Sequence, residues 1–155
     1  GDDGVTPRHG AVELSAGLGL LPDVRIDQHF DRRSRYGRLL AAVARSPGLV
    51  GLGVDEDTAA LVTDGRDIEV IGNGAVFVVD ASAAVTDACG PRPGLPLLVS
   101  GAVLHSLPAG TKFDLTQRAS FRTFIQTRGH KASSSPGLDE GAKRRGAKRR
   151  KEGQA

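Results

Sequence analysis

The chain has 155 residues, of which 39% are hydrophobic, 25% are charged and only 4% are aromatic. This length allows one domain that buries about two-thirds of its unfolded surface. No apolar run approaches the roughly 18–20 residues needed to span a bilayer, and no signal peptide opens the chain, so the sequence predicts a cytoplasmic protein with no membrane partner. A single cysteine, Cys89, excludes an intrachain disulfide.

The net charge of +3 is distributed unevenly along the chain. Residues 1–128 carry 13 Lys/Arg and 15 Asp/Glu, a charge of −2, whereas residues 129–155 carry 8 against 3, a charge of +5. The second part has almost nothing to bury and contains GAKRR twice in tandem. We therefore predict an α/β domain over residues 1–128 and a disordered basic tail over residues 129–155.

The basic tail admits two interpretations. Seven of the nine residues in 143–151 are Lys or Arg, a density that gives salt-dependent affinity for polyanions, so nucleic acid is one candidate partner. The alternative is a solvated tail with no partner. Charge alone leaves both interpretations open.

The first elements in chain order are loops and short strands. Residues 1–10 are rich in turn formers and predict a loop, and AVEL (11–14) predicts a short strand. A loop containing glycine and proline then leads into a strand over 23–27. Beyond it, apolar residues with helical spacing predict one main helix that ends near Arg45, because Pro47 disfavours helical geometry in the residue before it; these apolar residues are Tyr36, Leu39, Leu40 and Val43.

The chain after the helix is β-rich. Short apolar runs alternate with DEDT, TDGRD and GNG, which are typical of turns. The proline- and glycine-rich segment CGPRPGLP predicts a connection rather than an element. The expected strands are 49–54, 59–62, 68–71, 75–80, 99–107 and 111–115.

A candidate site lies at the end of the strand over 23–27. Asp27, Gln28 and His29 come directly before the predicted helix, where α/β proteins carry ligand-binding and catalytic groups. The reference pKa of histidine lies near neutrality, so His29 is a candidate general base. The alternative is a structural histidine hydrogen-bonded at the strand end.

Four arginines, at positions 32, 33, 35 and 38, follow this histidine. Cations at the start of a helix oppose its macrodipole, a small cost that favours a role in binding an anion. The planar guanidinium suits carboxylates, which it can bind through two hydrogen bonds. A solvated helix face with Asp31 as the local counterion is the alternative.

Four segments carry a resemblance to a known family: AGLGLLPDVRIDQHF, RSRYGRLLAAVARSP, GLGVDEDTAALV and IGNGAVFVVD. In this order they resemble the C-terminal half of cyanophycinase, over roughly residues 4–118. DQHF followed by RxRxxRLL is the specific combination, whereas GLG or DE alone would carry little weight. The resemblance fades near Arg118 and does not cover the basic tail.

The resemblance implies a fold and an activity. Cyanophycinases are serine exopeptidases related to glutamine amidotransferases and aspartyl dipeptidase, so the chain would form the C-terminal half of a three-layer α/β sandwich. Their substrate is cyanophycin, a poly-aspartate chain with arginine on its side chains, which they release as β-Asp-Arg dipeptides. The full-length enzyme would be a homodimer without a cofactor.

The resemblance also implies roles for single residues. His29 would be the triad histidine that takes the proton from the serine hydroxyl. Asp27 and Gln28 would line the substrate pocket, with Gln28 hydrogen-bonding the substrate. The substrate-binding arginines of the family match Arg33, Arg35 and Arg38.

The chain departs from the family pattern at the nucleophile. No GxSAG segment is present, and neither Ser15 nor Ser100 lies in a G-x-S-x-G frame. Since the chain also begins with glycine and contains no methionine, we expect a C-terminal portion whose missing N-terminal half is a partner and which is inactive alone. The acidic triad member is expected shortly before the GLG loop, near Asp2, Asp3 or Glu13.

The acidic run DEDT (55–58) is a candidate cation site. Hard cations require six or more oxygen ligands in a set geometry, and no wider pattern of ligands accompanies this run. We therefore expect no metal site.

Overall fold

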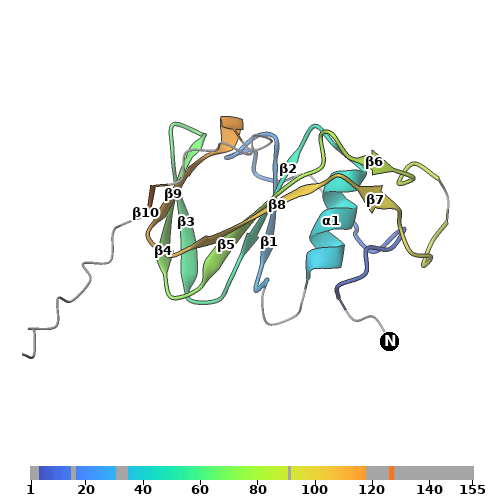
Figure 1. Ribbon diagram of the computed structural model, residues 1–155, viewed down its shortest axis with the longest axis horizontal. Coiled ribbons are helices and arrows are strands. Elements are labelled where there is room, and N and C mark those ends of the chain that lie inside the picture. The colour runs from blue at the N-terminus through green and yellow to red at the C-terminus, as the bar shows by residue number, and fades with distance from the viewer. Residues whose placement is uncertain (1–3, 15–16, 31–34, 91, 118–125, 128–155) are drawn as a thin grey trace, which may run out of the picture.

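The computed structural model describes residues 4–14, 17–30, 35–90, 92–117 and 126–127. These residues form one α-helix and two four-stranded sheets, with a small two-stranded sheet beside the helix (Figure 1). In chain order the elements are β1 (Val24–Gln28), α1 (Tyr36–Ala44), β2 (Val50–Val54), β3 (Thr58–Thr63), β4 (Asp67–Gly72), β5 (Ala75–Asp80), β6 (Val85–Thr86), β7 (Val99–Ser100), β8 (Val103–Pro108), β9 (Thr111–Asp114), the 3-10 helix η2 (Leu115–Gln117) and β10 (Gln126–Thr127).

The central sheet has the strand order β1-β2-β5-β8. β1 and β2 are parallel and are joined through α1, whereas the β2–β5 and β5–β8 pairs are antiparallel. Among the described strands, β1 and β8 are therefore at the two edges of this sheet. The register places Asp27 of β1 beside Gly53 of β2, so these two residues share a face of the sheet.

The two faces of the central sheet pack against different layers. On one side lies α1, and on the other lies the antiparallel second sheet, β10-β9-β4-β3 (Figure 1). Alternate residues of each central strand face the second sheet and form the larger apolar cluster with it. That cluster contains Val50, Leu52, Ile68, Val70, Val76, Val78, Leu107, Phe113 and Leu115.

The helix packs closely because β2 has two glycines on the face that it covers. A Cβ added to Gly51 would lie 2.9 Å from the side chain of Leu39, and one added to Gly53 would lie 2.7 Å from the ring of Phe30. Larger residues at these positions would push α1 and Phe30 away from the sheet. The buried residues on this face are Phe30, Leu39, Val43, Phe77, Val79 and Ala81.

Most of the predicted elements are confirmed. The main helix ends at Ala44, and the strands expected near 23–27, 49–54, 59–62, 68–71 and 75–80 are present within one or two residues of the expected bounds. The strand expected over 11–14 is wrong, since these residues form no strand. The expected strand 99–107 is divided into β7 and β8 at Gly101, whose φ of 84° breaks the extended backbone.

The predicted fold class is confirmed as an α/β protein with one helix and a β-rich second half. No helix in the part of the chain that the structure describes is long and apolar enough to cross a bilayer. The predicted basic tail (129–155) lies outside the described residues.

Candidate functional site

The end of β1 turns sharply and presents His29 to solvent. His29 has a φ of 54°, in the left-handed region that non-glycine residues seldom adopt. The next residue holds this turn, since the backbone N–H of Phe30 donates to the carbonyl of Val54 at 3.2 Å. The Phe30 ring is fully buried, 4.7 Å from the ring of Tyr36 and 5.0 Å from that of Phe77 (centroid distances). Burial of Phe30 therefore fixes the backbone from which the His29 side chain projects.

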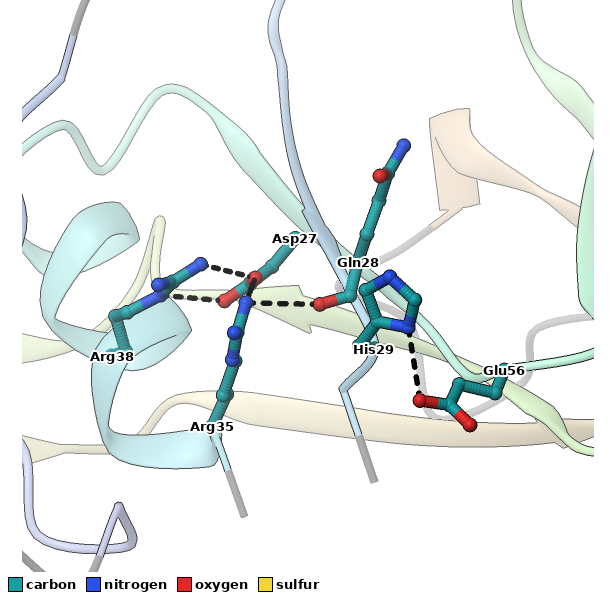
Figure 2. A network of polar contacts seen from close by, with 6 residues as sticks. All are labelled: Asp27, Gln28, His29, Arg35, Arg38 and Glu56. Atoms are coloured by element: carbon teal, nitrogen blue, oxygen red, sulfur yellow. Dashed lines mark hydrogen bonds and ion pairs between the residues drawn. The ribbon is translucent and has the colours of Figure 1, made fainter. Parts of the chain in front are cut away.

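His29 contacts a carboxylate through one ring nitrogen. Its Nδ1 lies 3.1 Å from Oε1 of Glu56, in the turn between β2 and β3 (Figure 2). An ionised carboxylate only accepts hydrogen bonds, so in this pair Nδ1–H is the donor and Nε2 of the neutral ring is left as an acceptor. The imidazole side chain is 61% exposed and that of Glu56 is 32% exposed. This arrangement suits a general base whose orientation is set by an acid.

Glu56 is not among the acids expected from the sequence, which are Asp2, Asp3 and Glu13. Asp2 and Asp3 lie outside the described residues, and Glu13 is exposed in a loop. The parallel pairing of β1 and β2 accounts for the contact between Glu56 and His29. Parallel strands carry their carboxyl ends to the same edge of a sheet, so a carboxylate directly after β2 comes close to a histidine directly after β1.

The other acids of the DEDT run have no metal-binding arrangement. Oδ2 of Asp55 accepts a hydrogen bond from the backbone N–H of Ala75 at 3.0 Å, which ties the end of β2 to the start of β5. Asp57 occupies a turn with a φ of 52°. Within the described ranges, no group of three or more His, Cys, Asp or Glu side chains could hold a metal ion.

The second part of the site is an ion-paired cluster on the helix side of β1. Nη1 of Arg35 donates to Oδ1 of Asp27 at 3.1 Å, and Nε of Arg38 donates to Oδ2 at 3.0 Å (Figure 2). Nη2 of Arg38 also contacts Oδ1, so Arg38 engages both carboxylate oxygens. Asp27 is only 6% exposed, and two guanidiniums against one carboxylate leave the cluster with an excess positive charge.

The counterion of these arginines is Asp27. Asp31, the counterion considered from the sequence, lies outside the described residues, as does Arg33. The Arg35 side chain is 17% exposed and the Arg38 side chain is 45% exposed, so Arg38 offers more of its surface to a ligand. The role of Arg33, Arg35 and Arg38 in binding an anionic substrate stays a prediction.

Gln28 contributes to the cluster through its backbone. Its carbonyl accepts a hydrogen bond from Nη1 of Arg35 at 3.0 Å. Its side chain points away from Asp27 because successive residues of a strand face opposite sides of the sheet (Figure 2). The amide of Gln28 and the Asp27 cluster are therefore on different faces of β1.

The described residues define an α/β protein with a histidine–carboxylate pair and an arginine cluster at the end of a parallel strand. No protein-family model matches the chain. The chain is 42% identical over 120 residues to the cyanophycinases of Trichormus variabilis and of a Nostoc species, an alignment that covers 76% of this chain. It is 38% identical over 115 residues to the cyanophycinase of Geminocystis herdmanii, with 74% of this chain covered.

The predicted resemblance to cyanophycinase is confirmed by these relatives, and about three-quarters of the chain is homologous to part of that enzyme. The chain spans about 40% of the length of the curated relatives that it matches.

Proposed function

We propose that the chain supplies the histidine, the acid and part of the substrate-binding surface of a cyanophycinase-type active site. The observation that carries the proposal is the contact between His29 Nδ1 and Glu56 Oε1, which joins the ends of two adjacent parallel strands. The nucleophilic serine would come from the part of the relatives that this chain does not span. With that part, the protein would form the three-layer sandwich of the glutamine amidotransferase type and a homodimer.

The proposed chemistry is acyl transfer to serine followed by hydrolysis. Nε2 of His29 takes the proton from the serine hydroxyl as its oxygen attacks the carbonyl carbon, and then gives that proton to the leaving amine as the peptide bond breaks. Water attacks the acyl-enzyme in the same way, and His29 returns the proton to the serine oxygen. Glu56 holds the imidazole in the required tautomer and stabilises the imidazolium that forms.

The proposed substrate is cyanophycin, released as β-Asp-Arg dipeptides. Each unit of this polymer carries a free carboxylate, which suits the excess positive charge of the cluster around Asp27. Arg38 is the strongest candidate for this contact because nearly half of its side chain is exposed. In this proposal Arg33 and Arg35 extend the anion-binding surface, Gln28 hydrogen-bonds the substrate from the other face of β1, and Asp27 lines the pocket while holding both guanidiniums.

The test is reconstitution of a whole enzyme. We would join this chain to the preceding segment of the Nostoc cyanophycinase and measure release of β-Asp-Arg from cyanophycin. We expect His29→Ala to lower kcat by about 10⁴- to 10⁶-fold, and Glu56→Gln to lower it by about 10⁴-fold. Glu13→Gln, which changes an exposed carboxylate outside the site, is the matched control and should retain the parent rate.

The chain without that segment is expected to release no dipeptide. Full turnover by the His29→Ala fusion would reject His29 as the base. A fusion that folds but in which Glu56→Gln leaves kcat unchanged would reject the histidine–carboxylate pair as the catalytic unit.

A second candidate function rests on the seven Lys/Arg between residues 143 and 151. These residues would bind a polyanion such as nucleic acid without sequence preference. The full chain should then bind double-stranded DNA with an affinity that falls steeply as salt increases, and a variant lacking residues 129–155 should lose this binding. Retained binding in the truncated variant would exclude the tail as the binding element.

A further inference from the structure

A separate pocket lies at the other end of α1 from Arg35 and Arg38. Its volume is about 460 Å³, within the range of small-molecule sites. It is formed by three stretches of the chain that are distant in sequence: residues 8–12, the end of α1 with the residue that follows it, and the segment that precedes β7. Neither His29 nor Glu56 lines it.

Among the described residues that line this pocket, the permanently charged ones are all arginines: Arg8, Arg45 and Arg92. Of these three, Arg92 alone forms an ion pair with a carboxylate that the structure describes, since its Nη1 lies 3.4 Å from Oδ2 of Asp87. Nη1 of Arg8 donates to the neutral carbonyl of Gly94 at 3.1 Å. Arg45 forms no ion pair with the described part of the chain. The pocket thus has more guanidinium charge than the neighbouring carboxylate neutralises.

The three arginines are held by different local features. Arg45 is the C-cap residue of α1, and a cation there complements the negative end of the helix dipole. Arg8 and Arg92 belong to other segments, and their printed contacts are with the Gly94 carbonyl and with Asp87. Asp87 also contacts groups other than Arg92. Its Oδ1 accepts a hydrogen bond from the backbone N–H of Leu98 at 2.9 Å and lies 3.3 Å from Nε2 of the buried His9.

The floor of the pocket is apolar. Ala41, Ala88 and Leu97 are all buried and belong to one cluster between α1 and the segment before β7. A ligand that fits must therefore present a short aliphatic body to this floor and negative charge to the arginines around it. Guanidinium groups match carboxylates in geometry, and three arginines beside the one carboxylate of Asp87 can accommodate two further negative charges. A small aliphatic dicarboxylate therefore meets both requirements.

We propose that this pocket is a binding site for a small aliphatic dicarboxylate. Its position on the far end of α1 separates it from the site of the proposed peptidase function, and it does not depend on that function. Cys89, the sole cysteine of the chain, is exposed and lines the pocket. The rate at which a thiol reagent modifies the chain therefore depends on the surroundings of this pocket.

The experiment measures the rate of alkylation of Cys89 in the full chain, in the presence and absence of succinate as the probe. Succinate should slow the reaction of Cys89 with iodoacetamide in a saturable manner, and the neutral analogue succinamide should not. The chain should also react faster with iodoacetate relative to iodoacetamide than a free thiol does, because a guanidinium about 6 Å from the reagent favours its anionic form by about threefold in water.

Substitutions of single arginines test whether succinate protects Cys89 by binding in this pocket. Arg45→Gln and Arg92→Gln should each remove most of the protection by succinate and lower the preference for iodoacetate, whereas Arg66→Gln, on the turn between β3 and β4, should change neither. Protection that is lost in Arg38→Gln but retained in Arg45→Gln would overturn the proposal and assign succinate to the Asp27 cluster. Absence of protection in the unaltered chain would also overturn it, whatever the outcome for the peptidase function.

Discussion

The ring of Phe30 occupies the space that a side chain at position 53 would need. A Cβ built on Gly53 would lie 2.7 Å from two carbons of that ring, which is closer than van der Waals contact permits. Phe30 directly follows His29, and Gly53 pairs with Asp27 across the parallel strands. Gly53 therefore leaves the space over β2 in which the Phe30 ring packs, and that ring anchors the backbone beside His29.

Gly53→Ala should consequently destabilise the chain. The added methyl group must displace a fully buried aromatic ring, and overpacking of this kind costs about 1–3 kcal/mol. Urea unfolding followed by circular dichroism measures this loss. Gly48→Ala is the matched control, because a Cβ at Gly48 meets nothing within 4 Å, and its stability should change by less than about 1 kcal/mol. Equal effects of the two substitutions would contradict the packing argument.

The carboxylate of Asp27 should be important for folding as well as for any ligand contact. Asp27→Asn removes the charge that both Arg35 and Arg38 contact, and we expect a loss of about 1.5–3 kcal/mol in the free energy of unfolding. Asp67→Asn is a suitable comparison. Asp67 is 52% exposed and lies 3.6 Å from the exposed Arg66, so its loss should cost less than about 1 kcal/mol. An Asp27→Asn chain as stable as the parent would show that the ion pairs of Asp27 with Arg35 and Arg38 do not stabilise the fold.

The geometry of Arg38 should matter beyond its charge. Nε and Nη2 of this residue engage both oxygens of Asp27, a two-pronged contact that the single ammonium of lysine cannot reproduce. Arg38→Lys should therefore lose about 1 kcal/mol of stability although the net charge is conserved. Arg66→Lys, at an exposed pair, should be neutral within about 0.5 kcal/mol. Thermal unfolding of both variants decides whether charge or geometry holds Asp27.

Asp87 should make the stability depend on pH. The backbone N–H of Leu98, with smaller contributions from His9 and Arg92, lowers the pKa of this carboxyl below its ordinary value of 3.8. A lowered folded-state pKa means that the stabilisation is fully present above the unfolded-state pKa and is lost as the pH falls through the folded-state pKa. Asp87→Asn should thus be less stable than the parent at pH 7, and the difference should shrink below about pH 4. A difference that stays constant from pH 7 to pH 2.5 would rule out this linkage.

The sequence predicts the β1–α1–β2 unit well because each signal there is local. The spacing of Tyr36, Leu39, Leu40 and Val43 marks the buried face of the helix, and Pro47 follows its end. The position of His29 at a strand end follows from the same local pattern. AVEL (11–14) alternates like a strand but has no neighbour to pair with among the described strands, and pairing is a tertiary property that the pattern does not contain.

The contacts between the residues of the candidate site depend on tertiary structure, which a local sequence pattern does not contain. Glu56 is 27 residues from His29, and the contact exists only because β1 and β2 lie side by side. The structure places Arg35 and Arg38 together on Asp27, and this shared contact depends on Asp27 facing the helix rather than the second sheet. That choice of face is set by the register with Gly53, which only the folded sheet reveals.

The position of β1 at the edge of the central sheet has a consequence for handling the protein. Along its outer side, β1 pairs with no other strand that the structure describes, and Ile26 on the same strand is 57% exposed. Such a border acts as a template on which a strand from another molecule can add. We expect the purified chain to form larger species as its concentration rises, and a charged residue in place of Ile26 to suppress this growth.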